Sequence, residues 1–176
     1  MQRALVMVGV VVVAFGGCAR VQDMMTKIPS ATATVLPTKD STVRGTVKFT
    51  QKDDHVIVSG HLTGLAPGPH GFHIHDKGNC TAPDGSSAGP HFNPRSMKHG
   101  GPMAEMRHGG DLGNIVADGS GVANFTIEVT GITLGTEDAS VIGRSVIVHA
   151  KADDLKTDPS GDSGPRLACG LISKSD

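Results

Sequence analysis

Six of the nine histidines in this chain follow a spacing that two adjoining metal sites would explain. Imidazole and carboxylate groups are ligands that zinc and copper accept in proteins, and a tetrahedral metal uses four of them. The chain offers more candidates than one metal can use: His73, His75, His91, His99, His108, Asp111 and His149. We therefore expect two metals side by side, one held by imidazoles alone and one by imidazoles with a carboxylate.

Two of these histidines stand two residues apart in the segment HGFHIH. Alternate side chains of a strand point to the same face, so His73 and His75 would project together, while Phe72 and Ile74 face an apolar side. His149 ends a second strand-like segment, SVIVHA. A single histidine at a strand end is more often a core or surface residue than a ligand, so His149 becomes a candidate only in the company of the others.

The remaining candidates lie in or beside a long stretch without strand character, residues 77–110, which holds seven glycines and four prolines. A structureless loop of this length is uncommon in a compact domain unless a ligand or a function orders it. His91, His99 and His108 belong to this loop, and Asp111 follows directly after it. Metal binding would supply the free energy that orders the loop, because ligation and folding are coupled.

Short strand patterns recur along the rest of the chain, and no helical stripe competes with them. Aromatic residues are limited to five Phe, so the core must be built from Val, Ile, Leu and Ala, which favours strands. The sequence DGSG at Asp118–Gly121 predicts a hairpin turn. We expect one antiparallel sandwich or barrel over residues 31–176. Its eight strands are predicted within residues 31–36, 43–50, 55–62, 70–75, 110–117, 121–129, 144–150 and 166–173.

The first residues form a targeting segment that is not part of the fold. Arg3 precedes an apolar run over Ala4–Phe15, which as a helix would be too short to span a membrane. The run leads into FGGC, which is similar to a bacterial lipoprotein signal, in which the cysteine becomes the lipidated first residue. We expect a signal peptide over residues 1–17, a lipid on Cys18 and a tether over residues 18–30. The alternative is an ordinary secretory signal that is cleaved nearby.

Either signal would deliver the protein to an oxidising compartment, and the lipid would attach it to a membrane of the cell envelope, on the periplasmic side. Removing Cys18 for the anchor leaves Cys80 and Cys169 as an even pair. A bridge between them would close a long loop, and the alternative of two buried free thiols is less frequent outside the cytosol. A bacterial lipoprotein would normally ignore the glycosylation sequons at Asn79 and Asn124.

Four segments together resemble the copper/zinc superoxide dismutases: GFHIHDKGNC, AGPHFNPRSMKHGGPMAEMRHGGDLGNI, IGRSVIVHAKADDL and GPRLACGLI. The resemblance runs from about Ala31 to Ile172, and its motifs are long and specific. It implies an eight-stranded, immunoglobulin-like Greek-key fold with a long metal-binding loop. It also implies one copper and one zinc per subunit, and an enzyme that converts two superoxide radicals to O2 and hydrogen peroxide.

The resemblance assigns each metal four ligands, with one imidazole shared between them. His91 would bridge the two metals and help to deliver a proton during turnover. His55 and His61 have no counterpart among the ligands and are expected to be solvated. Copper would be held by His73, His75, His91 and His149, and zinc by His91, His99, His108 and Asp111.

Further residues match supporting positions of the same family. Cys80 and Cys169 match its intramolecular disulfide, and Asp153 matches its link between the two metal sites. Arg166 matches an arginine that guides the anionic substrate, although such a residue could merely pair with backbone carbonyls of the disulfide loop. His70 matches a histidine that ties loops together and binds no metal.

Two departures from the family pattern concern assembly and substrate guidance. The loop Lys77–Cys80 is short, whereas Ile142-Gly143 matches the dimer region of the eukaryotic enzymes, so both a monomer and a homodimer stay open. The stretch Lys151–Pro165 is also short and lacks the guiding lysine of the family. Lys151 or Lys156 could substitute for it, although either is first of all a solvated charge.

Three functions compete on these observations. The first is an envelope dismutase that protects the compartment outside the inner membrane from superoxide. The alternative is a low-turnover copper- and zinc-binding protein of the same fold, but such a relative would be expected to lose one of the copper histidines. A zinc hydrolase fits less well, because no general base stands at motif spacing. The formal net charge of −1 gives no indication of nucleic-acid binding.

Overall fold

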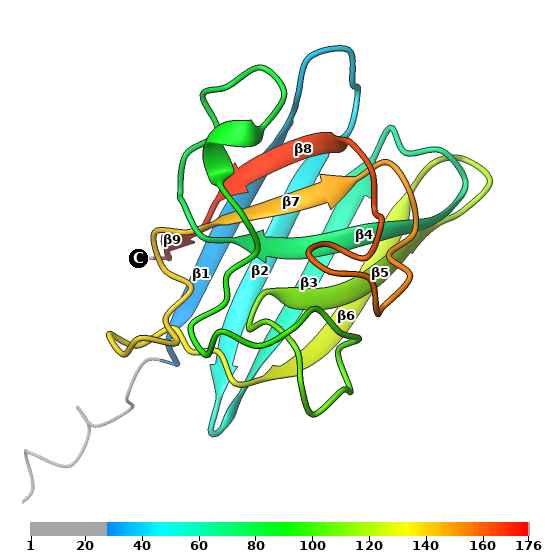
Figure 1. The fold of residues 1–176 in the computed structure, drawn as a ribbon. Coiled ribbons are helices and arrows are strands. Elements are labelled where there is room, and N and C mark those ends of the chain that lie inside the picture. The colour runs from blue at the N-terminus through cyan, green and yellow to red at the C-terminus, as the bar shows by residue number, and fades with distance from the viewer. Residues whose placement is uncertain (1–27, 176) are drawn as a thin grey trace, which may run out of the picture.

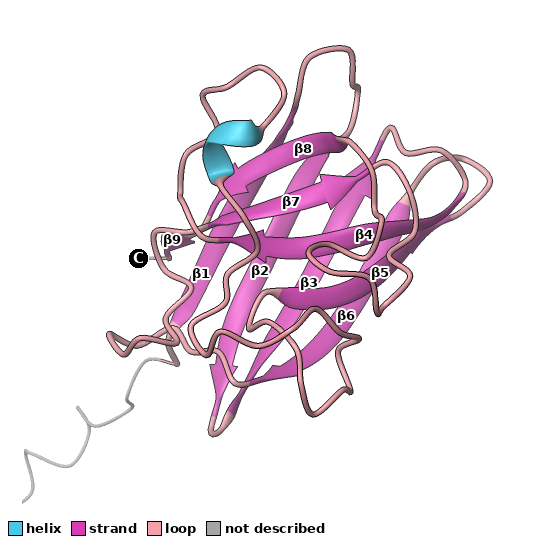
Figure 2. Ribbon diagram, in the orientation of Figure 1, coloured by secondary structure: helices cyan, strands magenta, loops and turns pink. Residues whose placement is uncertain are grey.

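The computed structural model describes residues 28–175, so the expected signal peptide, Cys18 and most of the tether lie outside the described residues. Strands joined by loops make up this part of the chain, together with one short 3-10 turn, η1 (Ser86–Ala88), as Figure 2 shows. The strands are β1 (Ser30–Pro37), β2 (Arg44–Lys52), β3 (His55–Thr63), β4 (Gly68–His75), β5 (Asp111–Ala117), β6 (Ala123–Thr130), β7 (Ser145–His149), β8 (Arg166–Leu171) and β9 (Ser173–Lys174).

Eight antiparallel strands form a nearly closed barrel in the order β5-β4-β7-β8-β1-β2-β3-β6, and the two-residue β9 pairs with β1. In Figure 1, β4, β5, β7 and β8 form one layer, and β1, β2, β3 and β6 lie behind it. β1 belongs to both layers, because Ser30 to Val35 pair with β2, whereas Leu36 and Pro37 pair with β8. The prediction of an all-β, eight-stranded antiparallel sandwich or barrel is confirmed.

Alternating apolar side chains build the core between the two layers. Val47 and Phe49 on β2 and Val56 and Val58 on β3 are fully buried, and burying a side chain of this size contributes about 1.5–3 kcal/mol. β4 and β7 differ from these strands, because they are buried on both faces over most of their length. One face of β4 and β7 meets the core, and loops cover the other, so the polar residues on that second face lie in a protected site.

The turn at Asp118–Gly121 reverses the chain but does not make a paired hairpin. The backbone N–H of Gly121 donates to the carbonyl of Asp118 at 3.0 Å, as a tight turn requires. The strands that flank it join different layers: β5 pairs with β4, and β6 pairs with β3. The hairpin prediction was therefore wrong in its pairing. Turn chemistry fixes a local reversal, whereas pairing depends on which layer each strand joins.

A disulfide joins Cys80, in the long loop, to Cys169 on β8, with a sequence separation of 89 residues. The predicted pairing is confirmed. The bridge fastens the long loop of residues 76–110 to the layer that carries β4 and β7, and so restricts where the loop can lie.

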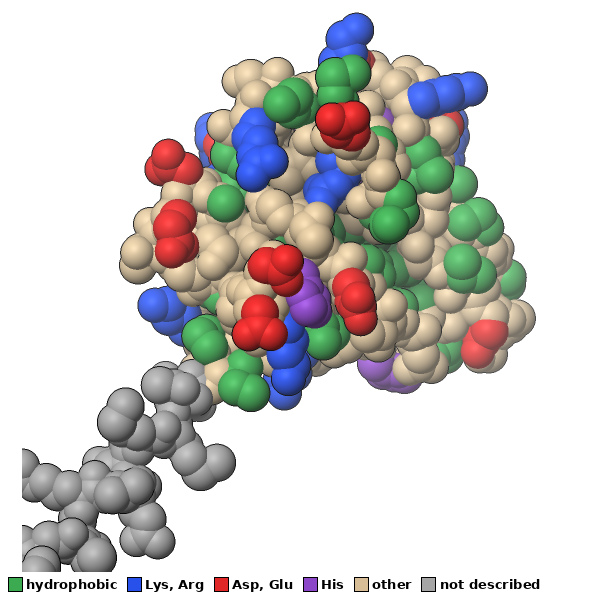
Figure 3. Space-filling view, turned by 90° about the horizontal axis from the view of Figure 1, so that it is seen from below, with side chains coloured by type: hydrophobic (Ala, Val, Ile, Leu, Met, Phe, Trp, Pro, Cys, Tyr) green, Lys and Arg blue, Asp and Glu red, His purple; other side chains and the backbone are tan. Residues whose placement is uncertain are grey.

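The surface carries charges of both signs. On the face shown in Figure 3, acidic and basic side chains are interspersed, in keeping with 16 basic and 17 acidic residues in the whole chain. Within residues 28–175, no helix is long and apolar enough to cross a membrane.

Candidate metal centre

Strands β4 and β7 carry three of the predicted ligands. His73 and His75 are 0% and 1% exposed, and they project from β4 on the side opposite to Phe72 and Ile74, which pack in the core. His149 ends β7, the neighbour of β4, and its ring centroid lies 4.9 Å from that of His73. Two adjacent strands of the sheet therefore fix the relative positions of these three imidazoles.

The long loop brings His91 against the end of β4. His91 forms an isolated antiparallel bridge with His75, and the backbone N–H of Phe92 donates to the carbonyl of Ile74 at 2.8 Å. The ring centroids of His75 and His91 are 4.9 Å apart. A short arm of the loop thus continues the sheet as an extra strand-like segment, which places the His91 ring beside the rings of β4.

Two groups of four buried side chains could each hold a metal ion, and the groups share His91. Within each group, the candidate ligand atoms all lie within 4.8 Å of one another. All seven predicted ligands therefore meet in one place, although they come from three strands and a loop. The first group is His73, His75, His91 and His149, and the second is His91, His99, His108 and Asp111.

The second group gathers around one carboxylate oxygen. The Nδ1 atoms of His91, His99 and His108 lie 2.8, 3.0 and 3.1 Å from Oδ1 of Asp111, the contact of His99 without hydrogen-bond geometry. Burial would raise the pKa of Asp111, but the neighbouring imidazoles outweigh burial and hold the pKa far below its ordinary range. Three imidazole nitrogens and one carboxylate are a donor set that tetrahedral zinc accepts.

Each histidine of the first group has one buried ring nitrogen without a hydrogen-bond partner. A buried polar atom that is left unpaired costs about 1–3 kcal/mol, so four such atoms close together call for a shared partner. A copper ion fits them, because copper binds nitrogen ligands more tightly than the other divalent first-row metals do. The four atoms are Nδ1 of His73 and Nε2 of His75, His91 and His149.

The opposite ring nitrogens of two of these histidines are held by backbone carbonyls. Nδ1 of His75 donates to the carbonyl of Gly89 at 2.8 Å, and Nδ1 of His149 donates to that of Gly164 at 3.1 Å. Since Nδ1 carries the proton, Nε2 is left with a lone pair for a metal. Burial lowers the pKa of His149 to about 3 and that of His91 to about 4, so both rings are neutral at pH 7.

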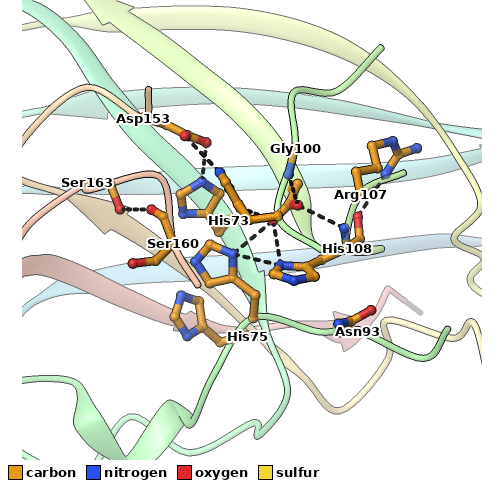
Figure 4. A network of polar contacts seen from close by, with 12 residues as sticks. His73, His75, Asn93, Gly100, Arg107, His108, Asp153, Ser160 and Ser163 are labelled. Carbon is orange, nitrogen blue, oxygen red and sulfur yellow. Dashed lines mark hydrogen bonds and ion pairs between the residues drawn. The ribbon is translucent and has the colours of Figure 1, made fainter. Parts of the chain in front are cut away.

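Asp153 lies between the two groups. Its Oδ2 is 2.8 Å from Nε2 of His73, a contact that Figure 4 shows from close by, and its Oδ1 is 2.9 Å from Nε2 of His99. Asn114 on β5 holds the backbone of Asp153 through two hydrogen bonds, 2.7 and 2.9 Å long. Gly161 has φ of +66°, and a Cβ there would clash with Oδ1 of Asp153, so this position requires glycine. Asp153 thus joins one imidazole of each group.

Arg166 begins β8 and is half-buried beside the first group. Its two terminal nitrogens donate to the carbonyls of Gly85 and Gly89, both at 2.7 Å. The carbonyl of Gly89 also accepts from His75, so the arginine and this histidine share one acceptor. Burial lowers the pKa of His75, and the positive charge of Arg166 acts in the same direction. Arg166 therefore pairs with backbone carbonyls of the loop and also acts electrostatically on the first group.

The other histidines lie outside both groups. The ring nitrogens of His70 lie 2.8 Å from the carbonyl oxygen of His149 and 2.9 Å from that of Ala66, which ties the start of β4 to the end of β7. The ring of His61 is exposed and bonds with Asn124 at 2.8 Å, and His55 bonds with its exposed neighbour Asp54.

Sequence reasoning missed two supports of the site. Asn114, which holds Asp153, stands in the β5 segment DLGNI, but nothing in that pattern distinguishes it from any strand asparagine. Arg144 stacks on Phe92, with its Cζ 3.6 Å from the ring centroid. Arg144 and Phe92 are far apart in the sequence, and only the fold brings them together.

Comparison with known proteins accounts for this arrangement. A family described as copper/zinc superoxide dismutase matches residues 43–172, a region that contains both four-residue groups and the disulfide. The chain is also 44% identical over 162 residues to a protein named extracellular superoxide dismutase [Cu-Zn] from Brugia pahangi, a match that covers 86% of this chain and 79% of that relative. This chain therefore belongs to the copper/zinc superoxide dismutases, enzymes that dismute superoxide with copper and zinc as cofactors.

Proposed function

We propose that the first four-residue group holds copper and the second holds zinc, with His91 between the two metals. The observation that carries this assignment is the set of four buried, unpaired ring nitrogens in the first group, next to a carboxylate-centred second group. The copper ligands are His73, His75, His91 and His149, and the zinc ligands are His91, His99, His108 and Asp111.

When bound, copper supplies the one-electron redox couple for dismutation, and zinc supplies a redox-silent charge. The chain's own residues determine where the ligand atoms lie and which atoms hold protons. Nδ1 of His91 faces Asp111, and its Nε2 is the unpaired atom of the first group, so this ring can serve both groups at once. Peroxide must take up protons before it leaves, and we assign to Nε2 of His91 the task of holding and passing one. Asp153 fixes the relative positions of the His73 and His99 rings by contacting Nε2 of each.

Arg166 is the proposed guide for the substrate. Without its first 17 residues the chain loses one basic residue, Arg3, and its formal charge becomes 15 − 17 = −2. A net negative protein repels an anion on average, so fast capture requires a local positive field. Arg166 supplies such a charge beside His75, and its planar fork of donors suits a small anion with two oxygens.

The proposed location is the outer side of a cell membrane. The Brugia relative is named extracellular, which supports export of this chain as well. The apolar run Ala4–Phe15 and the segment FGGC support a signal peptide over residues 1–17 and a lipid on Cys18. An anchored dismutase there would protect the envelope from superoxide.

Metal analysis of the purified mature protein, combined with a dismutase assay, tests the proposal. We expect one copper and one zinc per chain, with activity that follows copper content. One copper and one zinc without activity would instead favour a low-turnover metal-binding protein of the same fold. Zinc in both groups, with no copper after expression in copper-supplemented medium, would contradict the assignment of the first group.

A further inference from the structure

Arg144, in the turn before β7, contacts the residues that directly follow two of the proposed copper ligands. Its Nη1 donates to Oδ1 of Asp76 at 2.6 Å and to the backbone carbonyl of Asp76 at 2.9 Å. Its Cζ lies 3.6 Å from the centroid of the Phe92 ring. Asp76 follows His75 at the end of β4, and Phe92 follows His91 in the loop arm. One guanidinium therefore contacts the residue that follows each partner of the bridge between His75 and His91.

The guanidinium lies on the side of this bridge that faces away from the metal groups. Two backbone hydrogen bonds, 2.9 and 2.8 Å long, flank the bridge between His75 and His91 and keep it strand-like. Successive side chains of an extended segment point to opposite faces, so Asp76 and Phe92 project away from the side of the two ligand rings. Arg144 can thus act on the copper site only through the positions of these two neighbours.

Arg144 is itself fixed in place. Its Nε donates to the carbonyl of Ser140 at 2.8 Å, and the backbone N–H of Ile172 donates to its carbonyl at 2.8 Å. The side chain is 23% exposed, and the Phe92 ring beneath it is 2% exposed. A charge that is partly withdrawn from water, stacked on an aromatic face and hydrogen-bonded to a carboxylate holds its partners more firmly than an exposed ion pair does.

We propose that Arg144 is a positioning residue, which sets the distance between His75 and His91 and thereby the geometry of the copper site. The inference rests on the proposed copper ligands. Loss of the guanidinium frees the loop arm to shift relative to β4. Such a shift acts on copper more than on zinc, because copper needs both His75 and His91, whereas the zinc ligands are gathered around Asp111.

The test compares the metal affinities of the mature wild-type protein and Arg144→Met, both loaded with copper and zinc. Chelator competition gives a dissociation constant for each metal, and electron paramagnetic resonance reports the Cu(II) geometry. We expect the copper constant to rise by about tenfold or more, the zinc constant by less than about threefold, and the Cu(II) spectrum to change. Arg144→Lys keeps a charge for Asp76 but loses the planar stacking on Phe92. Its dissociation constants should therefore fall between those of the wild type and those of Arg144→Met.

Arg44→Met is the matched control, because it removes the same charge from an exposed arginine on β2, whose Nε contacts only the carbonyl of Thr42 among the described residues. It should leave both constants and the spectrum unchanged. If Arg144→Met does not fold, Asp76→Asn and Phe92→Leu decide the question, since each removes one contact of the guanidinium.

Equal losses of affinity for both metals with an unaltered Cu(II) spectrum would mean that Arg144 only stabilises the fold, and would overturn the inference. A wild-type protein that fails to bind copper would instead overturn the proposed function.

Discussion

Arg166 combines two tasks, pairing with loop carbonyls and presenting a charge beside His75, and substitutions can separate them. Arg166→Glu should lower the rate per bound copper by about tenfold or more, because the substrate is an anion. The decline of the rate with added salt should weaken or reverse, since screening would then relieve repulsion. Pulse radiolysis at several ionic strengths, on protein of verified copper and zinc content, measures both effects.

Arg166→Lys is the control, because it keeps the charge and loses the fork that reaches both carbonyls. Guidance predicts a rate for the lysine variant much closer to that of the wild type than to that of the glutamate variant. Equal losses in the two variants would point to the carbonyl contacts alone. An unchanged rate and salt dependence in Arg166→Glu would refute guidance.

The number of protons released when a metal binds should differ between the two four-residue groups. In the metal-free protein, burial lowers the pKa of His99, but its contacts with the carboxylates of Asp111 and Asp153 outweigh burial and raise it to about 10. His99 is then protonated at pH 7, and zinc, which needs a neutral ring, must displace that proton. His149, with a pKa of about 3, is neutral and binds a metal through its free Nε2 without releasing a proton. His91, with a pKa of about 4, is neutral as well, and it must release its one ring proton only when both of its nitrogens are ligated.

Calorimetry at pH 7 in two buffers of different ionisation enthalpy measures this release. The heat of zinc binding should differ between the buffers by an amount that corresponds to one proton from His99, and zinc affinity should rise with pH up to about 10. Identical heats of zinc binding in both buffers would contradict the raised pKa.

At the scale of elements, the long loop is the part that metals should order. Its segment 93–107 carries few backbone hydrogen bonds to the sheet, whereas β2 and β3 are paired along their whole length. Removing both metals should therefore speed amide hydrogen exchange in residues 93–107 by about tenfold or more and leave β2 and β3 nearly unchanged. Exchange that is equally slow in this segment with and without metal would show that the disulfide and the packing order the loop alone.

Local patterns were sufficient to predict the eight strands and to single out the seven candidate ligands, because alternation and spacing report directly on which face a side chain occupies. The division of these ligands between two metals came from the family resemblance. They failed where distant contacts decide. DGSG predicted a hairpin, yet β5 and β6 joined different layers. Arg144 showed no signal, since its contacts with Asp76 and Phe92 exist only once β4, β7 and the loop have assembled. Asp153 was identified through the family resemblance, because an acid after a strand is usually solvated.

At the scale of the whole molecule, the proposed anchor makes a prediction of its own. Cys18→Ser should remove the lipid and move the protein from the membrane fraction to the soluble fraction, because stable attachment depends on the acyl chains of that cysteine. Ala19→Ser is the matched control and should stay with the membrane. Fractionation and mass spectrometry of the mature N-terminus measure the outcome. A native N-terminus well beyond Cys18 would exclude a lipid on this residue.

The place of β1 in the sheet determines how the molecule would carry a mechanical load. Eleven residues lie between Cys18 and Ser30, and the connection reaches about 40 Å at full extension. Beyond that reach, a pull from the proposed anchor would act along β1. This strand is hydrogen-bonded on both edges, to β2 on one side and to β8 and β9 on the other. The load therefore shears many bonds at once, whereas an end strand such as β6 would peel away one bond at a time. The proposed tether would therefore be attached to a strand that resists being pulled out of the sheet.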